Sequence, residues 1–145
     1  MMKGLYELGI VFRGFVLVNY TSEILDEQDN FSEGSKDLRG AFISAIDTFA
    51  KNAFNNLTLE YLESNNILFI FKASEIKTSD CHEPEPIILY GLIDKKKRDT
   101  DKIVKKFLSK FQIILQLFIS RFQNKDFTEL SQFHSFKKEI ESFLI

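Results

Sequence analysis

The residue types best suited to catalysis or metal binding gather in one short polar stretch. Cys81, His82, Glu83 and Glu85 lie there, and Cys81 is the one cysteine of the chain. Neighbouring side chains rarely reach the same ion, because structural zinc sites use spaced pairs of ligands. A cysteine nucleophile needs a histidine held against it in a cleft. We therefore predict a solvated loop, with no metal ion, no cofactor and no catalytic residue.

Other motifs for ligand chemistry are also missing. Residues 21–36 are rich in acidic side chains, but Gly34 does not stand at the sixth position after an initial aspartate, as a calcium-binding loop requires. Neither GxxxxGK[ST] nor GxGxxG occurs, so the sequence predicts no phosphate-binding loop. The stretch 21–36 is expected to be a solubilising loop.

Basic residues form the strongest charge feature. Residues 1–90 are net acidic, whereas residues 91–145 are net basic. The favoured interpretation is a solvated connector that leads into the outer face of a helix; contact with anionic lipid is the alternative. Nucleic-acid binding is not expected, because the aromatic residues here follow a buried stripe rather than an exposed face. The basic residues concerned are Lys95, Lys96, Lys97, Arg98, Lys102 and Lys106.

A helix over residues 37–54 is expected to organise the rest of the chain. Its apolar residues recur at helical spacing and predict one broad buried face. The predicted buried residues are Leu38, Phe42, Ala45, Ile46, Phe49 and Ala53, and those predicted on the opposite side are Arg39, Ser44, Asp47, Lys51 and Asn52.

Five apolar runs have the length and composition of strands. Residues 5–12 and 15–20 flank the turn Arg13-Gly14 and predict a hairpin. Residues 57–63 begin with strict alternation, which is typical of a strand with one buried face, such as an edge. The runs 67–73 and 87–93 are nearly continuous and predict strands covered on both faces.

Two helices are predicted at the C-terminal end. The first spans residues 100–122, with Thr100 as its cap and a sustained apolar stripe. The second begins near Asp126, continues through residues 126–145 and is the natural cover for the first. Its expected inner residues are Leu130, Phe133, Lys137, Ile140 and Leu144, with Phe136 and Phe143 alongside.

These elements predict a single α/β domain (an α+β sandwich) over residues 1–145, with its core in 5–122. The order is ββαβββαα, which a five-stranded antiparallel sheet satisfies, with one helix on one face and two C-terminal helices on the other. This order resembles the longin domain of membrane-trafficking proteins, a longin/profilin-like arrangement. The matching features are the opening hairpin, the helix 37–54, the strand run 57–93 and the helix 100–122.

The resemblance implies a non-enzymatic adaptor in vesicle transport. Longin domains bind small GTPases or other longin or roadblock subunits, so the chain is expected to bind such a partner or to form a homodimer. We place the contact at the edge strand and the neighbouring helix, where apolar residues depart from the regular patterns. The predicted partner-binding residues are Ile43, Phe54, Thr58, Glu60 and Leu62.

Two other functions remain open at this stage. A PAS-like or profilin-like domain would hold a small molecule between sheet and helix, and a peripheral membrane module would use the basic patch. The N-terminal residues lack the long apolar segment of a signal peptide. Gln112 and Gln116 interrupt the longest apolar stretch, so no membrane span is expected. The expected location is the cytoplasm, with peripheral membrane contact as an option.

Overall fold

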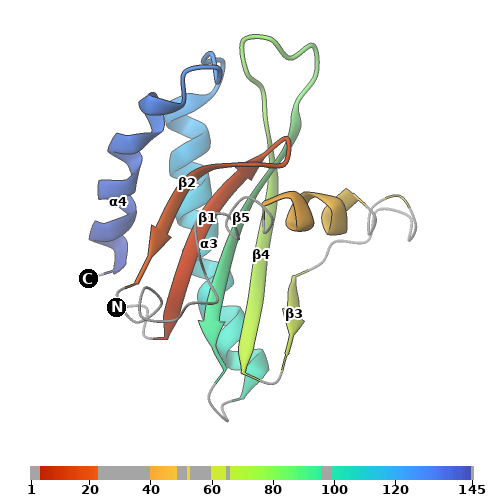
Figure 1. The fold of residues 1–145 in the computed structure, drawn as a ribbon, viewed down its shortest axis with the longest axis vertical. Coiled ribbons are helices and arrows are strands. Elements are labelled where there is room, and N and C mark those ends of the chain that lie inside the picture. The colour runs from red at the N-terminus through yellow and green to blue at the C-terminus, as the bar shows by residue number, and fades with distance from the viewer. Residues whose placement is uncertain are drawn as a thin grey trace.

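The computed structural model describes residues 4–22, 40–48, 52, 60–64, 66–95 and 99–144. They form a five-stranded antiparallel open sheet with helices on both faces, in the order ββαβββαα (Figure 1). The strands lie side by side in the order β2-β1-β5-β4-β3. The predicted fold class is therefore confirmed.

All five strands are present, and hydrogen-bonded pairing extends some of them beyond the predicted apolar runs. Ser74 and Glu75 belong to β4 because they pair with Ile87 and Pro86 across the β4–β5 hairpin. The polar stretch between the predicted strands 67–73 and 87–93 is therefore shorter than predicted. Residues 57–59 lie outside the described part of the chain. The strands are β1 (Leu5–Phe12), β2 (Phe15–Thr21), β3 (Tyr61–Glu63), β4 (Ile67–Ile76) and β5 (Glu85–Asp94).

The β1–β2 hairpin contains a tight turn and a bulge. Arg13 and Gly14 both have positive φ, 52° and 81°, as the two central residues of a type I′ turn require. Ile10 pairs with Val18 and Val11 pairs with Val16, so Leu17 is an extra residue in β2. Such a bulge bends an edge strand and interrupts its hydrogen-bond ladder.

Helix α3 (Thr100–Phe122) has the predicted bounds, but Asp99 rather than Thr100 caps it. The Asp99 side chain accepts a hydrogen bond from the Asp101 amide at 3.1 Å. A carboxylate at this position accepts from an otherwise free amide and also interacts favourably with the positive end of the helix dipole.

The predicted helix start near Asp126 is wrong. The Asp126 carboxylate accepts hydrogen bonds from the Thr128 amide and hydroxyl, so it closes a turn rather than a helix. Glu129 then caps the 3₁₀ turn η1 (Leu130–Phe133), which leads directly into α4 (His134–Leu144). Leu130, predicted to face inward, is 53% exposed.

The larger core lies between the sheet and helices α3 and α4. Alternate strand residues such as Leu8, Ile70 and Leu89 point into it and are fully buried. Its end nearest α4 is a cluster of rings with centroids 4.7 to 6.2 Å apart. The rings belong to Phe118, Phe122, Phe127, Phe133 and Phe136.

The opposite face carries the helical residues 40–48 and a smaller core. This helix turns a different side to the sheet from the one predicted. Ile43 is 1% exposed and Asp47 is 9% exposed, whereas Phe42 is 47% exposed and Ala45 is also exposed. The reason lies at Gly40, where an added Cβ would stand 2.8 Å from a Val16 methyl. The absence of a side chain lets the helix approach the sheet through its Gly40 side. Leu38, Phe49 and Ala53 lie outside the described residues.

Candidate functional site

The predicted edge strand exists, but only a short part of it is described. Strand β3 ends the sheet next to β4, as the edge prediction required. The Glu60 carbonyl accepts a hydrogen bond from the Phe71 amide at 2.8 Å, so the pairing begins one residue before β3. An edge strand has backbone groups that a second chain can pair with.

The side chains predicted to surround this edge do not all lie at the surface. Ile43 is buried in the smaller core, so its prediction as a partner-contacting residue is wrong. Leu62 is half-buried and packs against the same core, and Glu60 is exposed. Phe54 and Thr58 lie outside the described residues.

Phe42 takes the place that the sequence assigned to Ile43. The Phe42 side chain is 47% exposed, and its ring lies 6.5 Å from the ring of Phe69 on β4. The periodicity had assigned Phe42 to the core. The exposed apolar group next to β3 is therefore an aromatic ring on the helix.

Three of the six basic residues of the predicted patch lie in the described part of the chain. The Lys95 ammonium forms an ion pair with Glu63 on β3, and its amide donates to the Asn66 carbonyl at 3.0 Å. Lys102 and Lys106 are exposed on α3. Lys96, Lys97 and Arg98 lie outside the described residues. The pairing of Lys95 neutralises part of the predicted charge.

A polar cluster that the sequence did not predict ties the β1–β2 turn to the β4–β5 loop. The Arg13 guanidinium donates to Glu85 and to Asp80, with Nε–Oε1 and Nη1–Oδ2 distances of 3.0 Å each. It also lies over the Phe12 ring, 5.0 Å from the centroid. The Cys81 thiol, which is buried, donates to Glu85 at 2.7 Å. Cys81 is therefore part of a hydrogen-bonded network rather than the solvated loop residue that was predicted.

The ionisation of this cluster follows from its contacts. Hydrogen bonds from Arg13, then from Cys81, lower the pKa of Glu85. The Thr78 hydroxyl, followed by Arg13, lowers the pKa of Asp80. One cation therefore holds two ionised carboxylates, and the cluster has a net negative charge. The neighbouring His82 is exposed and makes no hydrogen bond with Cys81, so the two residues do not form a nucleophile–base pair.

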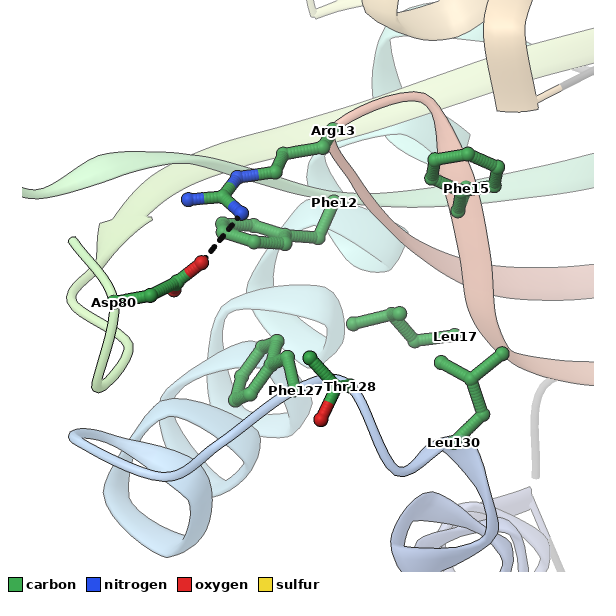
Figure 2. A pocket seen from close by; sticks show the side chains of 8 residues that line it. All are labelled: Phe12, Arg13, Phe15, Leu17, Asp80, Phe127, Thr128 and Leu130. Carbon is green, nitrogen blue, oxygen red and sulfur yellow. Dashed lines mark hydrogen bonds and ion pairs between the residues drawn. The ribbon is translucent and has the colours of Figure 1, made fainter.

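A hollow opens beside this cluster, between the hairpin and the segment that follows α3. Its volume is about 290 Å³. Figure 2 shows Arg13 directed toward Asp80 at one end, with Leu17 on β2 facing Phe127 and Leu130. The lining is mostly apolar, and the hydrogen bonds of Arg13 keep its charge at the rim. We call this hollow the hairpin cavity; its lining residues are Phe12, Arg13, Phe15, Leu17, Asp80, Phe127, Thr128 and Leu130.

Two chemical possibilities find no support in the described residues. No three His, Cys, Asp or Glu side chains there are grouped so that they could hold a metal ion. Nor does any helix in those ranges combine the length and apolar run that crossing a bilayer requires.

The class that fold and surfaces define is an open five-stranded antiparallel sheet, covered on both faces and ending in β2 and β3. A comparison of the chain with protein-family models and with curated proteins found no match in either. The order of elements and the surfaces therefore carry the functional argument.

Proposed function

We propose that this chain is a non-enzymatic, cytoplasmic interaction module of the longin type, which binds a small GTPase or another longin or roadblock subunit. The observation that carries the proposal is the edge strand β3, where Leu62 pairs with Phe69 of β4, together with the exposed ring of Phe42 that lies 6.5 Å from the Phe69 ring. Main-chain pairing at an open edge supplies affinity, and a neighbouring aromatic residue supplies an anchor.

The space under the helix 40–48 favours this function over ligand sensing. The hollow lined by Ile43, Phe71 and Ile88 has a volume of about 10 Å³, and the one beside Ser44 and Thr48 about 130 Å³. Small-molecule sites usually have volumes of about 300–1,000 Å³. A PAS-like site between the sheet and the helix 40–48 therefore finds no adequate space in the described residues.

The test is a binding screen against purified small GTPases, each loaded with GDP or a non-hydrolysable GTP analogue, and against roadblock-type proteins. We expect one partner to bind saturably, and Phe42→Asp to weaken that binding at least about tenfold, because a charge would replace an apolar ring that the partner buries. Light scattering of the free chain tests self-association through the same edge.

A matched control is available on the outer face of α3. Ile113 is 53% exposed and lies on a different element, so Ile113→Asp should leave partner binding unchanged. If no protein of these classes binds and the chain stays monomeric, the proposal is wrong. Equal losses in the two variants would show that general surface charge, and not the β3 edge, controls binding.

A further inference from the structure

The second edge of the sheet has a surface of its own. Within the described residues, β2 pairs with β1 alone. The hairpin cavity lies at the start of β2, and a second hollow of about 240 Å³ follows the strand toward its end. Leu17 lines both, so the two hollows are neighbours along β2. We call the pair the β2 groove; its second half is lined by Leu17, Val18, Asn19, Thr21, Phe133, His134 and Lys137.

The second hollow runs along the backbone edge rather than over one face. Val18 packs into the larger core, whereas the Asn19 amide donates to the Tyr90 hydroxyl on the opposite face, at 3.4 Å. Successive side chains of a strand point to opposite faces. Residues of both kinds can line one hollow only where it touches the outer edge of the strand. Helix α4 forms the far wall and lies alongside β2 (Figure 1).

The groove therefore has the parts that strand addition requires. The edge of β2 offers backbone donors and acceptors over Val18–Thr21, beyond the bulge at Leu17. The hairpin cavity offers an apolar pocket for one side chain, and exposed Phe15 and Leu130 stand beside it. In known cases of strand addition, the main chain gives affinity and such pockets give specificity.

A single extended segment fits this site better than a second copy of the chain. The bulge at Leu17 prevents β2 from pairing along its full length, as is common for edges that avoid joining another sheet. Two copies paired antiparallel through β2 would also bring both α4 helices to the same side. Strands pair about 4.8 Å apart, whereas helices pack about 8–10 Å apart. The spacing of the paired strands would therefore be too small for the two α4 helices beside them.

Charge indicates which kind of residue fits at each end of the groove. Asp80 lies at the hairpin-cavity end with its side chain 59% exposed, and the cluster around it is net negative. Lys137, exposed on α4, lies at the other end. A segment antiparallel to β2 places its N-terminal residues near Thr21 and Lys137, and its C-terminal residues near Leu17. At about 3.3 Å per residue, the two ends are about four residues apart.

We propose that the β2 groove binds an extended peptide segment of a partner protein as a sixth strand, with an acidic residue beside Lys137 and, about four residues later, an apolar residue in the hairpin cavity. This inference concerns the opposite edge from the GTPase-binding proposal and does not rest on it.

The experiment selects peptides of about nine residues from a random displayed library, with the full chain as bait and the Leu130→Asp variant as counter-selection. Leu130 is 53% exposed, so the variant should fold while placing a charge at the mouth of the cavity. We expect enriched peptides with the acidic–apolar spacing. Each should bind in solution at least about tenfold more weakly to Leu130→Asp than to the unchanged chain.

Three controls separate strand addition from general stickiness. Ile113→Asp, on a residue with the same exposed fraction as Leu130, should bind the selected peptide unchanged. Methylation of alternate peptide amides should abolish binding, because it removes main-chain donors. Lys137→Glu should weaken binding, and a peptide with lysine in place of its acidic residue should restore it. Phe42→Asp should have no effect, which keeps this site distinct from the β3 edge.

Several outcomes would overturn the proposal. One is a library with no peptide enriched over the Leu130→Asp bait. Another is a selected peptide that tolerates amide methylation, which would mean apolar adsorption without strand pairing. A concentration-dependent dimer that Leu130→Asp dissociates would assign the groove to a second copy instead.

Discussion

The two faces of the sheet are buried in different ways. Beneath α3 and α4 the core is apolar, and its tilted and edge-on phenylalanine rings fill the end next to α4. Beneath the helix 40–48 the core is smaller, and polar groups are buried with it: Glu7 is 1% exposed and Asp47 is 9% exposed. The Tyr90 hydroxyl donates to the Glu7 carboxylate at 2.7 Å.

The difference separates two sources of structural specificity. Ring packing in the larger core is non-directional and grows with buried area. A buried carboxylate, in contrast, is costly unless hydrogen bonds satisfy it, so the smaller face depends on particular partners. We therefore expect the larger face to supply most of the stability and the smaller face to fix the position of the helix beside the β3 edge.

The largest expected effect comes from matched Phe→Ala changes on the two faces. Phe118 is fully buried and its ring contacts four others, whereas Phe71 belongs to the smaller core and is 6% exposed. Phe118→Ala should lower the free energy of unfolding by about 5 kcal/mol, and Phe71→Ala by about 3 kcal/mol. Urea denaturation measures both. Equal losses would contradict the ranking of the two faces.

The next largest effect is expected from replacing a glycine on each face by alanine. A Cβ on Gly91 would lie 2.4 Å from Phe111 Cζ in the larger core, and one on Gly9 would lie 2.4 to 2.6 Å from three atoms of Tyr90 on the other face. Each Gly→Ala change should cost about 1–3 kcal/mol, with Gly9 the more costly because the hydrogen-bonded Tyr90 ring would have to move. Thermal unfolding measures the order.

A double variant tests the cause of the Gly91 effect. Combining Gly91→Ala with Phe111→Leu removes the ring atom that the new methyl group would meet. The two losses in unfolding free energy should then be less than additive, as expected for residues in direct contact. Full additivity would place the strain elsewhere.

How much the sequence could predict differs between these faces. The strand runs and the α3 stripe show clear periodicity, so the five-stranded sheet, the order of the elements along the chain and α3 were predictable from apolar spacing. The rotation of the helix 40–48 was not, because Gly40 decides it through a close approach to Val16, and these residues are distant in sequence. Phe42 and Ile43 are both apolar, and their residue types alone do not say which of the two is buried.

The unpredicted polar cluster has a similar cause. Arg13 is 67 residues from Asp80 and 72 residues from Glu85 in the chain, and neither pair has a recognisable spacing. The one available indication in the sequence was the turn Arg13-Gly14. It places a long basic side chain at the end of the β1–β2 hairpin, where it reaches the acidic residues of the β4–β5 connection. The β2 groove likewise depends on where η1 and α4 lie beside β2, which the predicted start near Asp126 had misplaced.

A smaller effect should follow from one hydroxyl on the polar face. Tyr90→Phe keeps the ring over Gly9 but removes the hydrogen bond to Glu7, so the free energy of unfolding should fall by about 1–2 kcal/mol. Tyr61→Phe on the half-buried β3 residue is the control, with an expected change below about 0.5 kcal/mol. A neutral Tyr90→Phe would mean that the polar face does not depend on this bond.

The smallest effect concerns the Arg13 cluster, at the end of the sheet where the two faces meet. Arg13 lines the hairpin cavity on one side and the hollow beside Asp47 on the other. Because Arg13 lowers the pKa of Glu85 in the folded chain, the unfolded chain binds the proton first as the pH falls. The contribution to stability is therefore complete above the ordinary glutamate pKa and is lost as the pH falls through the lower, folded pKa.

Arg13→Gln removes the charge while keeping a side chain of similar length. It should lower the free energy of unfolding by about 0.5 kcal/mol at pH 7, because the Arg13 side chain is 43% exposed and the pair is screened. It should also flatten the acid limb of stability against pH. Asp126 and Glu129 owe their lowered pKa values to Thr128 and Ser131, so their share of that limb is common to both proteins. Salt at about 1 M should reduce the difference between the two proteins. An acid limb that is identical in both would mean that Arg13 does not set the ionisation of Glu85 and serves only to hold the hairpin turn over Phe12.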